Sequence, residues 1–155
     1  MQGLMMDFQL TLPAMLRRCE QLHGPKEITT KLPSGDVHRY TYADMVERTK
    51  QLAVALKKLG VAEGDRVATL CWNHYQHLEA YFAIPCCGAV LHTLNLRLHP
   101  SDLAYIAGHA GDKVLIVDES LLPLLEQFRN EVKFKHIIVV CEPGNTPPEG
   151  MLDYE

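Results

Sequence analysis

The sequence lacks the features that mark several large classes of protein. Its 155 residues hold 15 Lys and Arg against 19 Asp and Glu, so the formal net charge is -4 and there is no basic excess for binding nucleic acid or an anionic membrane. The first residues form neither a basic stretch nor an apolar core, so no secretory signal is recognised. The longest apolar stretch, residues 78–96, is interrupted by Glu79, Pro85 and Gly88 and is not expected to span a bilayer.

Phosphate-binding and nucleophile motifs are also missing. Neither GxGxxG nor GxxxxGK[ST] occurs, which disfavours a Rossmann dehydrogenase or a P-loop enzyme, and there is no Gly-x-Ser-x-Gly elbow. The cysteines are odd in number, form no CxxC pair and mostly lie in apolar runs, as expected of a reduced, cytoplasmic protein; they are Cys19, Cys71, Cys86, Cys87 and Cys141. We therefore predict no catalytic, cofactor-binding or metal-binding residue in this chain.

The first part of the chain predicts a helix, a hairpin and a second helix. Residues 10–22 carry an apolar stripe that follows Thr11, a suitable N-cap. Residues 27–32 and 37–41 are β-rich runs on either side of Pro33-Ser34-Gly35-Asp36, a typical hairpin turn. A long amphipathic helix follows Thr41 and Asp44, which form a capping box, and it ends at Gly60.

Strands and helices then alternate. The strands are predicted at residues 66–72, 89–95, 113–117 and 136–141, and the helices at 74–87, 100–110 and 119–128, with Asn73 capping the first of these. Such alternation is typical of an α/β fold, here a parallel sheet with helices on both faces, preceded by a helix and a β-hairpin. We expect three units: residues 1–41, the α/β subdomain 42–141, and a Pro/Gly-rich linker 142–155 that leads into another element.

Two groups invite a chemical interpretation. Cys71-x-x-His74-x-x-His77 has zinc-ligand residue types, but no fourth ligand has a suitable spacing and the histidines are expected at the exposed start of a helix, so a structural or solvent-facing role is favoured. Asp118 follows a strand at the edge where α/β sheets bind ligands, yet it is also a natural N-cap, which we favour.

Several segments together resemble one family. These are Val37–Tyr42 followed by a long helix, the run Leu59–Ala68, Asn73, the Gly88-Ala-Val segment, Asn95-Leu-Arg97-Leu with Pro100 beyond it, and Lys113–Asp118. In this order and spacing they are similar to the amino-terminal part of acyl-CoA synthetases, the adenylate-forming ligases, and most similar to medium- and long-chain fatty-acyl members.

The resemblance implies an ATP-dependent fatty-acid:CoA ligase. Such an enzyme joins a fatty acid to AMP and then transfers the acyl group to coenzyme A, with Mg²⁺ offsetting the phosphate charge. The family's phosphate loop, adenine and ribose segments and catalytic lysine match no position of this sequence. The chain then serves as a scaffold, inactive alone, for downstream subdomains of the same protein.

The same resemblance suggests which residues face the shared cleft. Trp72, Asn73, Asn95 and Arg97 are expected at the carboxyl ends of strands, although Arg97 alone would more simply pair with a surface acid. Some relatives form homodimers through their amino-terminal domains, so the first helix and hairpin are the expected subunit contact. The alternative is a stand-alone α/β binding or assembly module without ligase activity.

Overall fold

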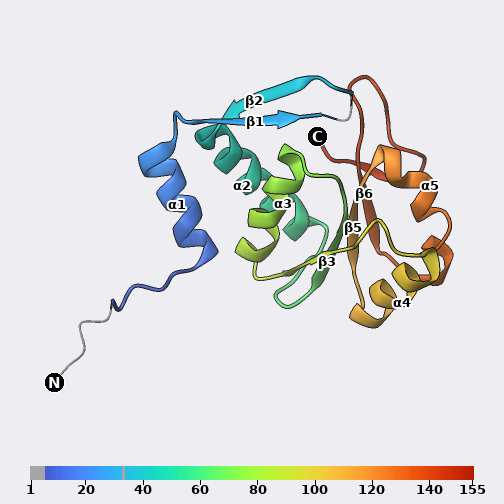
Figure 1. Ribbon diagram of the computed structural model, residues 1–155. Coiled ribbons are helices and arrows are strands. Elements are labelled where there is room, and N and C mark those ends of the chain that lie inside the picture. Colours follow the sequence, from blue (N-terminus) through green and yellow to red (C-terminus); the bar gives the residue numbers. More distant parts are fainter. Residues whose placement is uncertain (1–5, 33) are drawn as a thin grey trace.

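The computed structural model describes residues 6–32 and 34–155 (Figure 1). Pro33, in the predicted turn, lies outside the described residues. The helices and strands follow one another in this order: α1 (Leu12–His23), β1 (Glu27–Lys31), β2 (Val37–Thr41), α2 (Tyr42–Lys58), β3 (Arg66–Leu70), α3 (Tyr75–Cys86), β4 (Val90–Thr93), α4 (Pro100–Ala110), β5 (Val114–Asp118), η1 (Glu119–Leu121), α5 (Leu122–Leu125), η2 (Arg129–Glu131), β6 (His136–Val140) and β7 (Leu152–Asp153).

The body of the molecule is a parallel sheet of five strands in the order β4-β3-β5-β6-β7. Helices α2 and α3 pack on one face, and α4 and α5 on the other (Figure 1). The chain leaves β3 for β4 on one side and then returns to pair β5 on the other side, so the winding direction reverses at β3. The predicted α/β class is confirmed.

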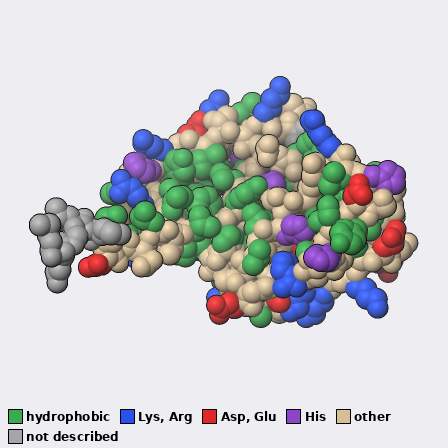
Figure 2. All heavy atoms as spheres, turned by 60° about the horizontal axis from the view of Figure 1, so that its bottom comes forward, with side chains coloured by type: hydrophobic (Ala, Val, Ile, Leu, Met, Phe, Trp, Pro, Cys, Tyr) green, Lys and Arg blue, Asp and Glu red, His purple; other side chains and the backbone are tan. Residues whose placement is uncertain are grey.

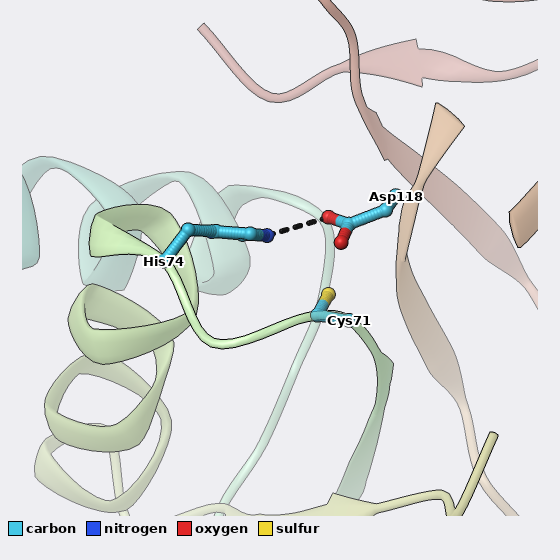
Figure 3. A group of neighbouring side chains, drawn as sticks. All are labelled: Cys71, His74 and Asp118. Carbon is cyan, nitrogen blue, oxygen red and sulfur yellow. Dashed lines mark hydrogen bonds and ion pairs between the residues drawn. The ribbon is translucent and has the colours of Figure 1, made fainter. Parts of the chain in front are cut away.

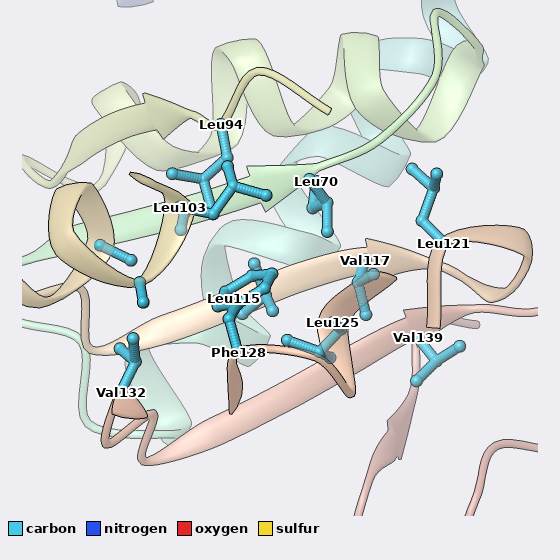
Figure 4. Close-up of a cluster of buried hydrophobic side chains, with 13 residues drawn as sticks. Leu70, Leu94, Leu103, Leu115, Val117, Leu121, Leu125, Phe128, Val132 and Val139 are labelled. Carbon is cyan, nitrogen blue, oxygen red and sulfur yellow. The ribbon is translucent and has the colours of Figure 1, made fainter. Parts of the chain in front are cut away.

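Both faces of the sheet are apolar, so its central strands are buried on both sides. On β5, Val114 and Ile116 contact the α2/α3 layer, whereas Leu115 and Val117 point into the α4/α5 layer drawn in Figure 4. All five residues of β5 are buried. This continuous apolar run is the pattern expected of a parallel strand covered by helices. A polar side chain buried within these strands needs an internal partner, as Thr69 has in His77.

Helix α1 and the hairpin form a smaller core of their own against α2 and α3. Its buried members are Leu16, Tyr40, Met45 and Val46. Strands β1 and β2 pair antiparallel, with Glu27 opposite Thr41, as the turn sequence predicts. The hairpin therefore lies beside the main sheet rather than in it, and in Figure 1 it spans the top of the molecule above α3.

The ends of α2 follow the sequence closely. Thr41 and Asp44 exchange side-chain and backbone hydrogen bonds in a complete capping box. At the other end Gly60 takes a left-handed φ of 85°, and the Val61 amide donates to the Leu56 carbonyl, as in a Schellman motif.

Two helix predictions are wrong. The segment predicted as one helix at 119–128 is broken into η1, the single turn α5 and a loop, because Pro123 has no amide hydrogen and restarts the helix as an N-terminal residue. The cap of α3 is not Asn73 but His74, whose ring nitrogen accepts from the His77 amide.

Residues 142–155, expected as a linker, also contain a short strand, β7, which pairs in parallel with β6.

Candidate functional site

The carboxyl ends of β3 and β5 meet where the winding of the sheet reverses, the position at which open α/β sheets bind ligands. Three buried side chains gather there: Cys71 after β3, His74 at the start of α3, and Asp118 at the end of β5 (Figure 3). Successive side chains of a strand point to opposite faces of the sheet. Cys71 and Asp118 therefore lie on the same face as Val67 and Ile116, which pack against α2 and α3, and both point toward α3.

Asp118 joins these elements through two short hydrogen bonds. Its Oδ1 lies 2.6 Å from His74 Nε2, and its Oδ2 accepts from the Trp72 amide at 2.7 Å. The side chain is 6% exposed and makes no capping bond to the following turn. Asp118 does occupy the predicted N-cap position, before η1, but its carboxylate does not cap the turn because it reaches back across the sheet edge to β3 and α3.

The hydrogen bonds define the proton positions on both histidines. The Nδ1 atom of His74 accepts from the His77 amide at 3.2 Å, so its proton is on Nε2, which donates to Asp118. The His77 Nδ1 donates to the Trp72 carbonyl at 3.1 Å, and its Nε2 accepts from the Thr69 hydroxyl at 3.0 Å. Both rings are buried, so the expectation that they lie at an exposed helix start is wrong.

This cluster is organised as a hydrogen-bonded junction rather than as a ready metal site. The three potential ligand atoms of Cys71, His74 and Asp118 lie within 4.8 Å of one another. To bind a metal, however, His74 Nε2 would have to lose its proton, and Nδ1 cannot take it up while the His77 amide points at that atom. Burial, followed by the nearby Asp118 charge, also raises the pKa of the Cys71 thiol and opposes the thiolate that a metal or a nucleophilic reaction requires.

A cavity of about 520 Å³ adjoins the junction, between the hairpin and the ends of β5, β6 and β7. His74 and Asp118 border it. The hairpin contributes Leu32, Ser34, His38 and Tyr40, and the loop 141–145 lies on the opposite side. Glu119 holds this loop in place by accepting hydrogen bonds from the Glu142 amide and the Asn145 side chain, each at 2.7 Å.

An ionic network fixes one wall of this cavity. The Arg48 guanidinium contacts the buried carboxylate of Glu79 at 2.7 Å and both oxygens of Glu155 at 2.8 Å. The Tyr154 hydroxyl donates to the other Glu79 oxygen at 2.7 Å. The side chain of Glu79 is only 1% exposed, so these partners supply the hydrogen bonds that its buried charge requires. The segment after β7 is thereby attached to α2 and α3.

The four residues predicted to face a cleft lie elsewhere on the same sheet edge. Trp72 and Asn73 follow β3, whereas Asn95 and Arg97 follow the neighbouring β4, where the Asn95 side chain accepts from the Arg97 amide at 3.0 Å. Asn73, Asn95 and Arg97 are exposed, Trp72 is 41% exposed, and none of the four lines the cavity. The pairing of His74 with Asp118 was not predicted, although Asp118 directly follows a predicted strand and His74 lies two residues after another.

Comparisons with known proteins identify the class to which this fold and sheet edge belong. The AMP-binding enzyme family matches residues 17–154. The chain belongs to this family, and the predicted resemblance is confirmed.

Two relatives and one solved structure show which branch is similar. The chain is 52% identical to a long-chain-fatty-acid–CoA ligase of Thermus thermophilus over 97% of its own length and 28% of that protein. It is 33% identical to a medium-chain-fatty-acid–CoA ligase of Ectopseudomonas oleovorans, over 100% of this chain and 29% of that one. A crystal structure of the anthranilate CoA ligase AuaEII with anthranoyl-AMP superposes with a TM-score of 0.76 at 28% identity, covering 86% of this chain and 26% of the other. The chain thus matches the amino-terminal part of such ligases and spans under a third of their length.

Replacing Asp118 by Asn tests the junction. The two partners of Asp118 are both N–H donors, and an amide offers one acceptor oxygen, so one donor would face an NH₂ group. We expect Asp118→Asn to lower the free energy of unfolding by about 2 kcal/mol or more. It should also shift the emission of Trp72, the one tryptophan in the sequence. Ser120→Ala, which removes only the bond from the Trp72 indole, is the control, and equal denaturation midpoints for the two variants would contradict the role of Asp118.

The buried His77 predicts a dependence of stability on pH. Burial lowers the pKa of His77 below its ordinary value, so around pH 6.5 the unfolded chain binds a proton that the folded chain does not. Stability contributed by the neutral ring is present above that pH and falls as the pH drops through it. The free energy of unfolding is measured in urea at pH 7.5 and at pH 5.5. Between these pH values it should fall less for His77→Gln than for the unmodified chain, whereas for exposed His109→Gln it should fall as much as for the unmodified chain. If the stability of His77→Gln falls between the two pH values as much as that of the unmodified chain, this assignment is refuted.

Proposed function

We propose that this chain is the amino-terminal part of an ATP-dependent ligase that joins a fatty acid to coenzyme A through an acyl-adenylate. The observation that carries the proposal is the 52% identity to a long-chain-fatty-acid–CoA ligase along 97% of the chain. The similarity to a medium-chain ligase supports the same substrate class. The adenylate makes the carboxylate oxygen a good leaving group, so that the thiol of coenzyme A can displace AMP.

The described residues contribute a scaffold to this reaction. ATP with Mg²⁺ and coenzyme A serve the complete enzyme, but the residues here do not fit a triphosphate. The cavity wall carries six carboxylates and a single arginine, Arg48, whose guanidinium is already bound to two carboxylates. The acidic members are Asp44, Asp118, Glu119, Glu142, Asp153 and Glu155. No step of the reaction is therefore assigned to these side chains.

The cleft shared with the downstream subdomains is proposed on the β3/β4 side of the edge. Exposed residues follow two adjacent parallel strands there, Trp72 and Asn73 after β3 and Asn95 and Arg97 after β4. The Trp72 indole is held by the Ser120 hydroxyl at 3.1 Å, which fixes an exposed aromatic surface at this position. The exposed Trp72 ring and the Arg97 guanidinium, which has no ion pair among the described residues, are groups that suit an apolar substrate ending in a carboxylate.

A cytoplasmic location and a homodimer complete the proposal. All five cysteines are free thiols, which suits a reducing compartment. In the part of the chain that the structure describes, no helix has the length and apolar character needed to cross a membrane. Large apolar side chains are exposed on and just before α1, and Figure 2 shows hydrophobic surface near that end of the molecule; they are Phe8, Leu10, Leu12, Met15 and Leu22. This face is the proposed subunit contact.

The activity is tested by exchange of labelled pyrophosphate into ATP in the presence of fatty acids. The complete protein that contains this sequence should catalyse exchange with medium- or long-chain fatty acids, because the activated acyl-adenylate forms reversibly. The 155-residue chain should give the rate of a blank. Exchange by the 155-residue chain would refute its role as a scaffold, and a complete protein without fatty-acid-dependent exchange would refute the ligase assignment.

The dimer is tested by sedimentation of the 155-residue chain. Charges on the proposed contact should dissociate it because they would have to be desolvated in the interface. We expect Met15→Glu with Leu22→Glu to sediment as a monomer at concentrations where the unmodified chain self-associates. Val54→Glu, which alters an exposed apolar residue on α2, is the matched control. A monomeric unmodified chain, or a double variant that associates equally well, would contradict the proposal.

A further inference from the structure

The cavity next to the β1–β2 hairpin is lined by residues whose buried polar atoms lack hydrogen-bond partners in the described part of the chain. The His38 Nε2 atom is buried and has no hydrogen-bond partner among these residues. The buried Tyr40 hydroxyl has no partner in hydrogen-bond geometry, and burial together with the nearby Glu79 carboxylate raises its pKa. Both residues line the cavity from alternate positions of β2, and Tyr40 is 8% exposed. The ring of Tyr75 locks them in place, since His38 stacks on it at 3.9 Å and Tyr40 meets it edge-on at 5.5 Å. A buried polar atom held rigidly without a partner calls for one.

The charge of the wall excludes the ligands of the adenylation reaction from this cavity. A fatty carboxylate or a phosphate would approach several carboxylates, and the single guanidinium is already occupied by Glu79 and Glu155. The Glu142 carboxylate has no ion-pair partner among the described residues. Neutral and cationic groups are therefore the ones that this wall favours.

A polypeptide supplies what the wall requires. Its carbonyl and amide groups would offer partners to His38 and Tyr40, and its apolar side chains would cover Leu32, Val140 and Pro143. A Lys or Arg would pair with Glu142. The chain reaches residue 155 at this cavity, because Asp153 and Glu155 line it and Arg48 binds both oxygens of the Glu155 side chain. The relatives continue far beyond the 28% of their length that this chain spans.

We propose that this cavity binds the ligase segment that directly follows Glu155, and that the β1–β2 hairpin packs over that segment. The inference rests on the proposed function, since it requires a downstream part of the same chain. It assigns the two sides of the sheet edge different tasks: the β5/β6 side binds protein, and the β3/β4 side is left for the substrate cleft.

Cys141 reports on this binding, because its half-buried thiol lines the cavity. The labelling rate of each cysteine by iodoacetamide is measured by mass spectrometry in the complete ligase and in the 155-residue chain. We expect Cys141 to react at least tenfold more slowly in the complete ligase. Cys87, half-buried at the end of α3 and outside the cavity, is the exposure control, and buried Cys71 must stay unreactive in the short chain as evidence that it is folded.

Equal labelling of Cys141 in the two proteins would overturn the proposal, and so would protection that appears only after fatty acid or ATP is added. Pyrophosphate exchange by the same complete ligase separates failure of this inference from failure of the ligase assignment.

If the short chain does not fold, a substitution in the complete ligase tests the same proposal. Ser34→Trp, which fills the cavity from the hairpin turn, should increase the rate of tryptic cleavage after residue 155 at least tenfold, whereas Val37→Trp outside the cavity should not. Equal cleavage rates for these two variants would overturn the proposal.

Discussion

Burial of the parallel sheet on both faces is the constraint from which the other features follow. With apolar layers above and below β3 and β5, a polar side chain within the strands must find an internal partner, as Thr69 does with His77. The remaining polar groups are confined to the strand ends. Asp118 is the most buried of these at the carboxyl edge, and by binding His74 and the Trp72 amide it connects two strands to the start of α3. The geometry of that edge depends on this one carboxylate.

The edge is divided by charge into two regions. The cavity beside β5 and β6 is lined by carboxylates, and its arginine is bound to Glu79 and Glu155, whereas exposed Asn95 and Arg97 follow β4. A ligase that activates a carboxylate with ATP must bring two anions together, so an acidic region suits contact with protein better than contact with substrate. Under the proposed ligase function, this division leaves the β4 end of the edge for the substrate cleft.

Most of the fold could be predicted from sequence because its signals are local. The capping box at Thr41, the left-handed Gly60 and the β-branched run before Asp118 each identify an element by short-range chemistry. The junction could not, because the partners of Asp118 lie 44 and 46 residues away in sequence. A residue after a strand also serves equally well as a helix cap, and only the register of β3 against β5 decides between the roles. The break at Pro123 was readable, since proline restarts a helix.

The central claim is that these residues support adenylation chemistry performed by other parts of the ligase. Its most direct test is calorimetric titration of a non-hydrolysable acyl-adenylate analogue into the 155-residue chain and into the complete protein. The account predicts binding with a stoichiometry near one for the complete protein and no heat of binding for the short chain. Stoichiometric binding by the short chain, abolished by substitutions in its own cavity such as Tyr40→Phe, would contradict it.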